Sequence, residues 1–171
     1  EGAPPKSVGN STTTSFDVET EEEALLVLLG LTETVCMRLR DHEMYGQVVS
    51  VHFRNFDFVS ARRERTLYSA TDSTRMIYDM VKTLFREIWT GEPLRQLGVS
   101  VGRLTTNQIT QLSLFQPINE REERRDQTVD SIRKRYGQTS LYRSGFLHSG
   151  IHPVIGGVIA EEDYPMMSSL L

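Results

Sequence analysis

The 171-residue sequence is poor in cysteine, has no long apolar run and has no excess of positive charge, and each of these features excludes a class of protein. Its single cysteine, Cys36, excludes an internal disulfide and a cysteine metal cluster. Because Cys36 lies in an apolar helical pattern, we predict a packing role in a reducing compartment rather than a reactive thiol. No membrane span or signal peptide is visible, so we expect a cytoplasmic protein. The net charge of -4 argues against a protein that coats nucleic acid by bulk charge.

The sequence also lacks the patterns of a complete active site. It has no phosphate-binding loop, nucleophile elbow or dinucleotide fingerprint. Most carboxylates lie in helix first turns or alternate with arginine, as from Glu120 to Asp126, which is typical of a solvated helix. His148 and His152 have the spacing of two metal ligands on a helix, but a glycine and a proline disfavour a helix there. We therefore expect neither catalysis nor a metal site within these residues.

Hydrophobic periodicity predicts an α+β fold with a four-stranded antiparallel sheet and two helices on one face, followed by a third helix and an irregular tail. Val8 and Phe16 are the expected apolar anchors of the first strand. A capping box from Thr20 to Glu23 opens the first helix. The expected elements are strand 7–18, helix 20–42, a strand after residue 46, its exposed or bulged partner 57–69, a helix from residue 72 or 73 to 90, and strand 94–104.

The last of these strands has an outward row that is nearly bare of side chains. Its alternation places Leu97, Val99 and Val101 inward. The outward residues are Gln96, Gly98, Ser100 and Gly102. Glycine inside a strand marks either close approach of another backbone or ligand, or a bulge, and both interpretations remain open.

The segment after residue 118 is highly charged. It predicts a third helix over 119–136, with Val129, Ile132 and Tyr136 as its contacts to the rest of the protein. Residues 137–171 mix glycine, proline, serine and scattered apolar side chains, so we expect an irregular tail that packs locally or on a neighbour.

Arginine supplies most of the positive charge, and its guanidinium can donate two parallel hydrogen bonds to a phosphate group. Six arginines fall on the presumed central hairpin or at the ends of the final strand, where they could border one sheet face. They are Arg54, Arg62, Arg63, Arg65, Arg95 and Arg103. By contrast, His42 and His52 have no evident partner and are interpreted as surface or strand residues.

Residues 111–115, QLSLF, form an apolar island between the final strand and the charged helix. Exposed apolar groups of this kind mark a partner site. The alternative is that Leu112, Leu114 and Phe115 cover the end of the sheet.

Several segments together resemble one family. PPKSVGNSTT, VCMRLR, FRNFDFVSARRERTL, LRQLGVSVGRL, QLSLF and IRKRYG resemble, in order and spacing, the C-terminal part of Y-family translesion DNA polymerases of the bacterial polymerase IV and UmuC-like type. The resemblance covers about residues 4–136. It implies a thumb-to-little-finger linker ending at residue 6, a little finger domain over 7–106, a clamp-binding linker over 107–118, and a C-terminal helix and tail over 119–171.

The resemblance also implies partners and contacts. Primer-template DNA would be held through its backbone, independently of base sequence, during DNA repair, lesion bypass and the SOS response. The bacterial sliding clamp would be bound by Gln111, Leu112, Ser113, Leu114 and Phe115. The implied phosphate contacts are Lys6, Ser7, Gly9, Arg62, Arg63, Arg65, Thr66, Arg95, Gly98 and Ser100.

Catalysis is expected elsewhere. In the family, the catalytic carboxylates and their magnesium ions belong to the palm, which these residues do not include, so we expect no cofactor here. The chain opens at Glu1 with linker-type residues, from which we expect a piece of a longer polypeptide. Oligomeric state is left open. The alternative function is a non-enzymatic interaction module that uses the sheet and QLSLF for protein partners and touches no DNA.

Overall fold

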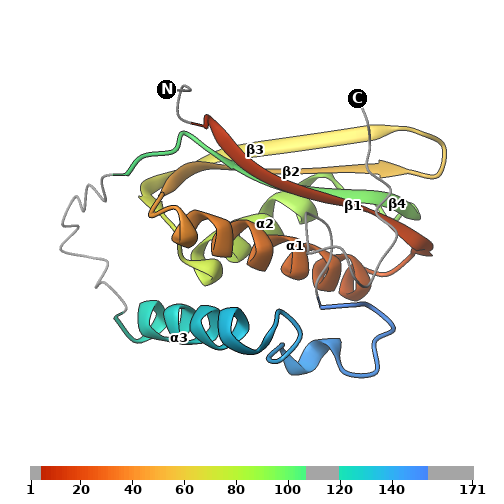
Figure 1. Cartoon of the computed structure of the whole chain (residues 1–171). Helices are drawn as coiled ribbons and strands as arrows, with labels where there is room; N and C mark the ends of the chain where they lie inside the picture. Colours follow the sequence, from red (N-terminus) through yellow and green to blue (C-terminus); the bar gives the residue numbers. More distant parts are fainter. Residues whose placement is uncertain (1–4, 107–119, 154–171) are drawn as a thin grey trace.

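The structure is a computed structural model that describes residues 5–106 and 120–153 (Figure 1). Four antiparallel strands form one sheet in the order β1-β4-β2-β3, and α1 and α2 both pack on one of its faces, which confirms the predicted α+β fold. α3 forms a third layer beyond these two helices (Figure 1). The elements are β1 Ser7–Val18, α1 Glu21–Asp41, β2 Gly46–Asn55, β3 Ser60–Thr71, α2 Thr74–Ile88, β4 Leu94–Gly102, α3 Glu120–Tyr136 and the short 3-10 helix Ser144–Phe146.

The core lies between the sheet and the two helices. The central strands β2 and β4 contribute alternate side chains that are fully or almost fully buried: Val49, Val51, Phe53, Leu97, Val99 and Val101. Phe85 of α2 meets Phe53 edge-on, with ring centroids 6.1 Å apart, and stacks on Trp89 at 5.3 Å. At about 25 cal/mol per Å² of apolar surface removed from water, this layer supplies most of the stabilising free energy.

Both helices of this layer begin where their sequences indicate. The Thr20 hydroxyl accepts a hydrogen bond from the Glu23 amide at 3.2 Å, and the Glu23 carboxylate accepts one from the Thr20 amide at 3.2 Å, so the capping box is present. In α2, Ser73 is the N-cap and accepts from the Met76 amide at 3.3 Å. Cys36 is fully buried in α1, and this burial raises the pKa of its thiol to about 12, consistent with a packing role.

The apolar anchors of β1 differ from the prediction. Phe16 is 39% exposed, whereas Val18 is fully buried. The pairing of β1 with β4 shifts between Thr13 and Val18, so Phe16 lies in the irregular part of the strand. Val8 packs against the core as expected.

The docking of α3 also differs from the prediction. Val129 and Ile132 are half-buried, in line with the prediction, but the buried residues of α3 are charged, namely Asp126, Asp130 and Arg133, and Tyr136 is exposed. The carboxylates from Glu120 to Asp126 were predicted to be solvated, and this prediction is wrong for Asp126, which is buried. The cause is Arg40, near the end of α1, whose guanidinium draws both carboxylates inward.

Arg40 is the centre of a buried polar cluster. Its Nε donates to Asp130 at 2.5 Å, and its Nη1 donates to the Asp72 carbonyl at 2.8 Å and the Thr74 hydroxyl at 3.0 Å. Asp126 lies 3.4 Å from the same nitrogen and also accepts from the Thr74 amide at 3.1 Å. Burial alone would lower the pKa of Arg40, but the hydrogen bond and charge of Asp130 raise it overall.

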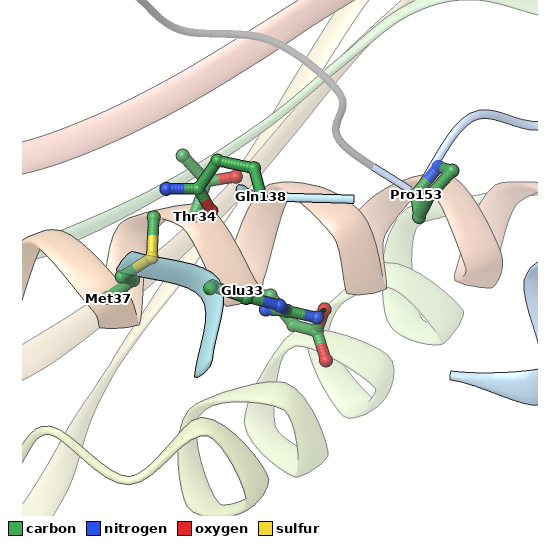
Figure 2. Close-up of a pocket in the computed structure, with 6 residues that line it drawn as sticks. Glu33, Thr34, Met37, Gln138 and Pro153 are labelled. Atoms are coloured by element: carbon green, nitrogen blue, oxygen red, sulfur yellow. Dashed lines mark hydrogen bonds and ion pairs between the residues drawn. The ribbon is translucent and has the colours of Figure 1, made fainter. Parts of the chain in front are cut away.

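A second cluster joins α3 and the tail to the middle of α1. Buried Glu33 accepts from Arg133 of α3 at 3.1 Å and from Arg143 of the tail at 2.5 Å. Figure 2 shows Glu33, Thr34 and Met37 of α1 with Gln138 and Pro153 around a cavity of about 10 Å³, which holds one water molecule at most. The described part of the tail, residues 137–153, packs on the rest of the domain, because Phe146 and Ile151 are buried with the core residues. None of the helices in residues 5–106 and 120–153 is long and apolar enough to cross a membrane.

Replacing Arg40 by Ala should release α3. Asp126 and Asp130 would lose a buried counter-charge, which costs about 3–5 kcal/mol when one partner of a buried pair is removed. We expect the amides of α3 to exchange hydrogen much faster while those of β2 and β4 stay protected.

The matched control is Arg124→Ala, which removes an exposed i,i+4 pair with Glu120 on the same helix. Exposed pairs of this kind contribute about 0.3–0.5 kcal/mol, so exchange should change little. Unchanged protection of α3 in Arg40→Ala would contradict the assigned role of this cluster.

Candidate nucleic-acid interface

The sheet face opposite α1 and α2 is not covered by any described element (Figure 1). Residues directly opposite one another in neighbouring strands point to the same side, so the pairing defines this face as four rows that cross all four strands. In the order β1, β4, β2, β3 the rows are Ser7, Gly102, Val48, Thr66; Gly9, Ser100, Ser50, Glu64; Ser11, Gly98, His52, Arg62; and Thr13, Gln96, Arg54, Ser60. We call this surface the free face.

Seven residues predicted to contact DNA come together on the free face. They are Ser7, Gly9, Arg54, Arg62, Thr66, Gly98 and Ser100. Two more lie at its margin, since Lys6 precedes Ser7 and Arg103 follows Gly102 with a positive φ of 52°. The two strands on the β1 side contribute mainly glycine and serine, which allow a ligand to approach the backbone closely.

Arg63 and Arg65 do not lie on this face, so the expectation that the hairpin arginines share one surface is wrong for these two. They are paired with Val51 and Val49, whose side chains lie under the helices. Both guanidiniums meet Glu87 of α2, at 3.4 Å for Arg63 and 2.9 Å for Arg65. The reason is the two-residue period of a strand, which sends every second arginine to the helical side.

Arg95 is engaged by its neighbours. Its Nε donates to Asp17 at 3.0 Å, and its guanidinium lies 5.3 Å from the centroid of the Phe56 ring. Arg95 stands where the pairing of β2 with β4 shifts, so alternation alone does not assign it to a face.

Gly98 is explained by a histidine on the neighbouring strand. A Cβ atom built on Gly98 would lie 2.0 Å from Cε1 and 2.3 Å from Nε2 of His52. The imidazole therefore occupies the space that a side chain would need. A bulge is excluded because β4 pairs regularly with both neighbours here.

Positive charge on the free face is modest. Arg62 lies 3.2 Å from Glu64, the one carboxylate in the four rows, and both side chains are exposed. Arg54 donates to the Ser60 hydroxyl at 3.2 Å. Burial, and then the charge of Arg62, lower the pKa of His52, so its imidazole is neutral at pH 7. The face thus combines two accessible guanidiniums with hydroxyl donors, which suits phosphate oxygens.

Sequence reasoning missed two residues of this face, His52 and Glu64. His52 was interpreted only as a surface or strand residue, because its contact with Gly98 depends on strand pairing that a single segment does not reveal. Glu64 lies between Arg63 and Arg65 in the sequence, and the two-residue period of a strand places Arg62 and Glu64 on the same side.

The pentapeptide Gln111 to Phe115 lies outside the described residues. In residues 5–106 and 120–153, no group of three or more His, Cys, Asp or Glu side chains could hold a metal ion.

The sequence was compared with family models and with curated proteins. The model of the impB/mucB/samB family C-terminal domain matches residues 5–114. DNA polymerase IV of Clostridium acetobutylicum is 37% identical over 143 residues, which cover 83% of this chain and 36% of that protein. DNA polymerase IV 2 of Bacillus subtilis is 36% identical over 146 residues, covering 83% and 35%. The chain therefore spans about a third of the length of these curated relatives.

Among solved structures, the fold is similar to the little finger domain of PolIV in its complex with the beta-clamp processivity factor. The TM-score is 0.50 and the identity 19%, over 64% of this chain and 99% of that one. At this identity the likeness shows the fold, a four-stranded sheet backed by two helices.

Replacing Gly98 by Ala should push the His52 ring off the sheet. Because the added Cβ would overlap the ring, we expect a loss of about 1–3 kcal/mol, as for other overpacking changes. The released imidazole should regain solvent, so its pKa should rise toward 6.5, which an NMR titration of its ring protons would detect. In the wild type, the unfolded state binds the proton more readily, so stability should fall as the pH drops below about 6.5, and less so in the variant.

The control is a double-mutant cycle with His52→Ala. Without the imidazole, Gly98→Ala should be nearly neutral. An equal cost in both backgrounds would contradict the proposed contact.

Proposed function

The chain belongs to the impB/mucB/samB C-terminal domain family, and on this premise we propose that it is the little finger and C-terminal region of a Y-family translesion DNA polymerase. It holds the backbone of primer-template DNA on the free face and binds the sliding clamp through QLSLF. The main observation in support is the strand pairing, which places Arg54 and Arg62 beside glycine and serine residues on an uncovered sheet face.

The free face suits the backbone of a duplex better than its bases. Arg54 and Arg62 offer guanidiniums to phosphate oxygens, and the hydroxyls of Ser7, Ser11 and Ser100 add shorter donors. Contacts of this kind position a protein on DNA without reading sequence. A surface that ignores base identity suits an enzyme that must accept damaged templates.

Catalysis is assigned to parts of the polymerase beyond this region. The curated relatives are about three times as long as the matched segment, and the carboxylates and magnesium of nucleotide transfer belong, on this proposal, to their other parts. The present chain contributes binding and orientation. Nucleotide incorporation by these residues alone would contradict this division of roles.

The clamp-binding proposal rests on the position and chemistry of the pentapeptide. QLSLF lies between two anchored parts of the protein: Thr105 pairs with Tyr45 after β4, and α3 is held by the Arg40 cluster. Leu112, Leu114 and Phe115 supply apolar anchors, and a few such anchors carry most of the energy when a short segment binds a groove.

Changing Arg54 and Arg62 together to Ala should weaken DNA binding. Each lost phosphate contact should reduce the slope of log affinity against log salt concentration by about 0.9. Fluorescence anisotropy with a labelled primer-template, repeated at several salt concentrations and on two unrelated sequences, would measure both effects. The loss should be equal for both sequences.

The matched control is Arg63→Ala with Arg65→Ala, which removes the same charge from the helical side of β3. A third variant, Glu64→Gln, should strengthen binding because it removes a carboxylate from the free face. Equal losses in both arginine pairs would contradict the face assignment. Binding by none of the proteins would favour the alternative, an interaction module without DNA contact.

Changing Leu114 and Phe115 to Ala should abolish clamp binding. Anchor residues of this kind cost about 2 kcal/mol or more each on truncation, roughly a thirtyfold loss of affinity per residue and roughly several hundredfold for the pair. Surface plasmon resonance on immobilised bacterial clamp would measure it, with Ile118→Ala as a control in the same segment. Intact clamp binding together with a lower melting temperature would show instead that the two side chains cover the sheet.

A further inference from the structure

The tip of the β2–β3 hairpin exposes apolar side chains that the core does not use. Phe56 is 58% exposed, Phe58 81% and Val59 60%. The hairpin reaches past the helices at one end of the sheet (Figure 1). Aromatic rings exposed to water do not stabilise the fold, so we interpret these side chains as part of a binding site.

The backbone at the tip is held in a strained but fixed turn. Phe58 has a φ of 62°, in the left-handed region that residues other than glycine rarely adopt. Asn55 holds the turn: its amide donates to the Val59 carbonyl at 2.9 Å, and its side-chain oxygen accepts from the Val59 amide at 2.9 Å. The Phe58 amide also donates to the Asn55 carbonyl at 3.2 Å. The ring of Phe58 is therefore presented on a rigid support, which lowers the entropy cost of binding.

An arginine contacts one ring of the tip, and another arginine lies at its base. The guanidinium of Arg95 lies over Phe56 at 5.3 Å, in cation–π contact. Arg54 and Ser60, which flank the turn on either strand, form the last row of the free face. The tip thus continues the proposed phosphate-binding surface beyond the end of the paired strands.

We propose that Phe56 and Phe58 stack on unpaired bases of a single-stranded segment that adjoins the duplex. This inference rests on the proposed function, because the duplex must first lie on the free face. Exposed aromatic rings beside arginines are the usual platform for single-stranded nucleic acid, and stacking tolerates any base. A protein partner would need a broader apolar area than these two rings, which polar Asn55, Asp57 and Ser60 interrupt.

The test compares DNA with and without unpaired bases. Anisotropy would measure binding of a blunt duplex, of the same duplex with a 5′ template overhang, and of an overhang made of abasic nucleotides. The wild type should bind the overhang about fivefold or more tightly than the blunt or abasic DNA, the lower range for base–aromatic stacking. A 2-aminopurine base in the overhang should also lose fluorescence on binding.

Phe58→Gly is the sharpest variant. It removes the ring and also relieves the positive φ, so the protein should melt a few degrees higher while the overhang preference disappears. Phe56→Ala should likewise lose the preference. The control is Tyr136→Ala on α3: Tyr136 is 66% exposed with Arg135 at 5.4 Å from its ring, but lies on the layer farthest from the sheet (Figure 1).

The outcomes separate the two proposals. If the wild type binds duplex in a salt-sensitive way but gains nothing from the overhang, the stacking proposal fails and the proposed function stands. If no DNA binds at all, the proposed function fails and the stacking proposal with it. An unchanged preference in Phe58→Gly and Phe56→Ala, or an equal loss with Tyr136→Ala, overturns the role of the tip.

Discussion

The burial of one sheet face beneath α1 and α2 fixes the chemistry of the other. Because side chains alternate along a strand, the valines and Phe53 that fill the core determine which residues lie on the free face. A slip of one residue between β2 and β3 would exchange Arg62 for Arg63 on that face and would bring Glu87 of α2 opposite the wrong side chain. Packing on the inside therefore sets the position of positive charge on the outside.

α3 is attached by a different kind of force. Its buried contacts are ion pairs, with Arg40, Asp126 and Asp130 at one point and Glu33 and Arg133 at another. Such pairs are demanding in geometry because each desolvated charge must find its partner. They hold the helix in one register and anchor the chain on the far side of QLSLF. The pentapeptide is thus joined at both flanks to the same folded body.

The order and type of the elements were predictable because local signals agree with the fold: the capping box of α1, the N-cap Ser73 of α2 and the alternation of β2 and β4. The docking of α3 was not, since the sequence around Asp126 has the charge pattern of a solvated helix, and the attraction of Arg40 comes from residues 86 and 90 positions away. The two-residue period of a strand implies that Arg62 and Arg63 point to opposite sides of the sheet. Only the pairing register shows which of them lies on the free face. The contact of His52 with Gly98 required strand pairing, which no single segment encodes.

The small charge of the free face is consistent with binding assisted by a tether. Arg54 and Arg62 are partly offset by Glu64, and His52 is neutral at pH 7 because burial and Arg62 lower its pKa. Non-specific DNA binding typically has dissociation constants of about 10⁻⁴–10⁻⁶ M at physiological salt. A short tether gives an effective concentration on the order of millimolar, which exceeds these values. On the proposed function, a weak face beside a clamp-binding segment is therefore occupied while the protein is on the clamp and empties soon after it leaves. A more basic face would keep the protein on DNA without the clamp, and the acidic net charge of the chain disfavours that outcome.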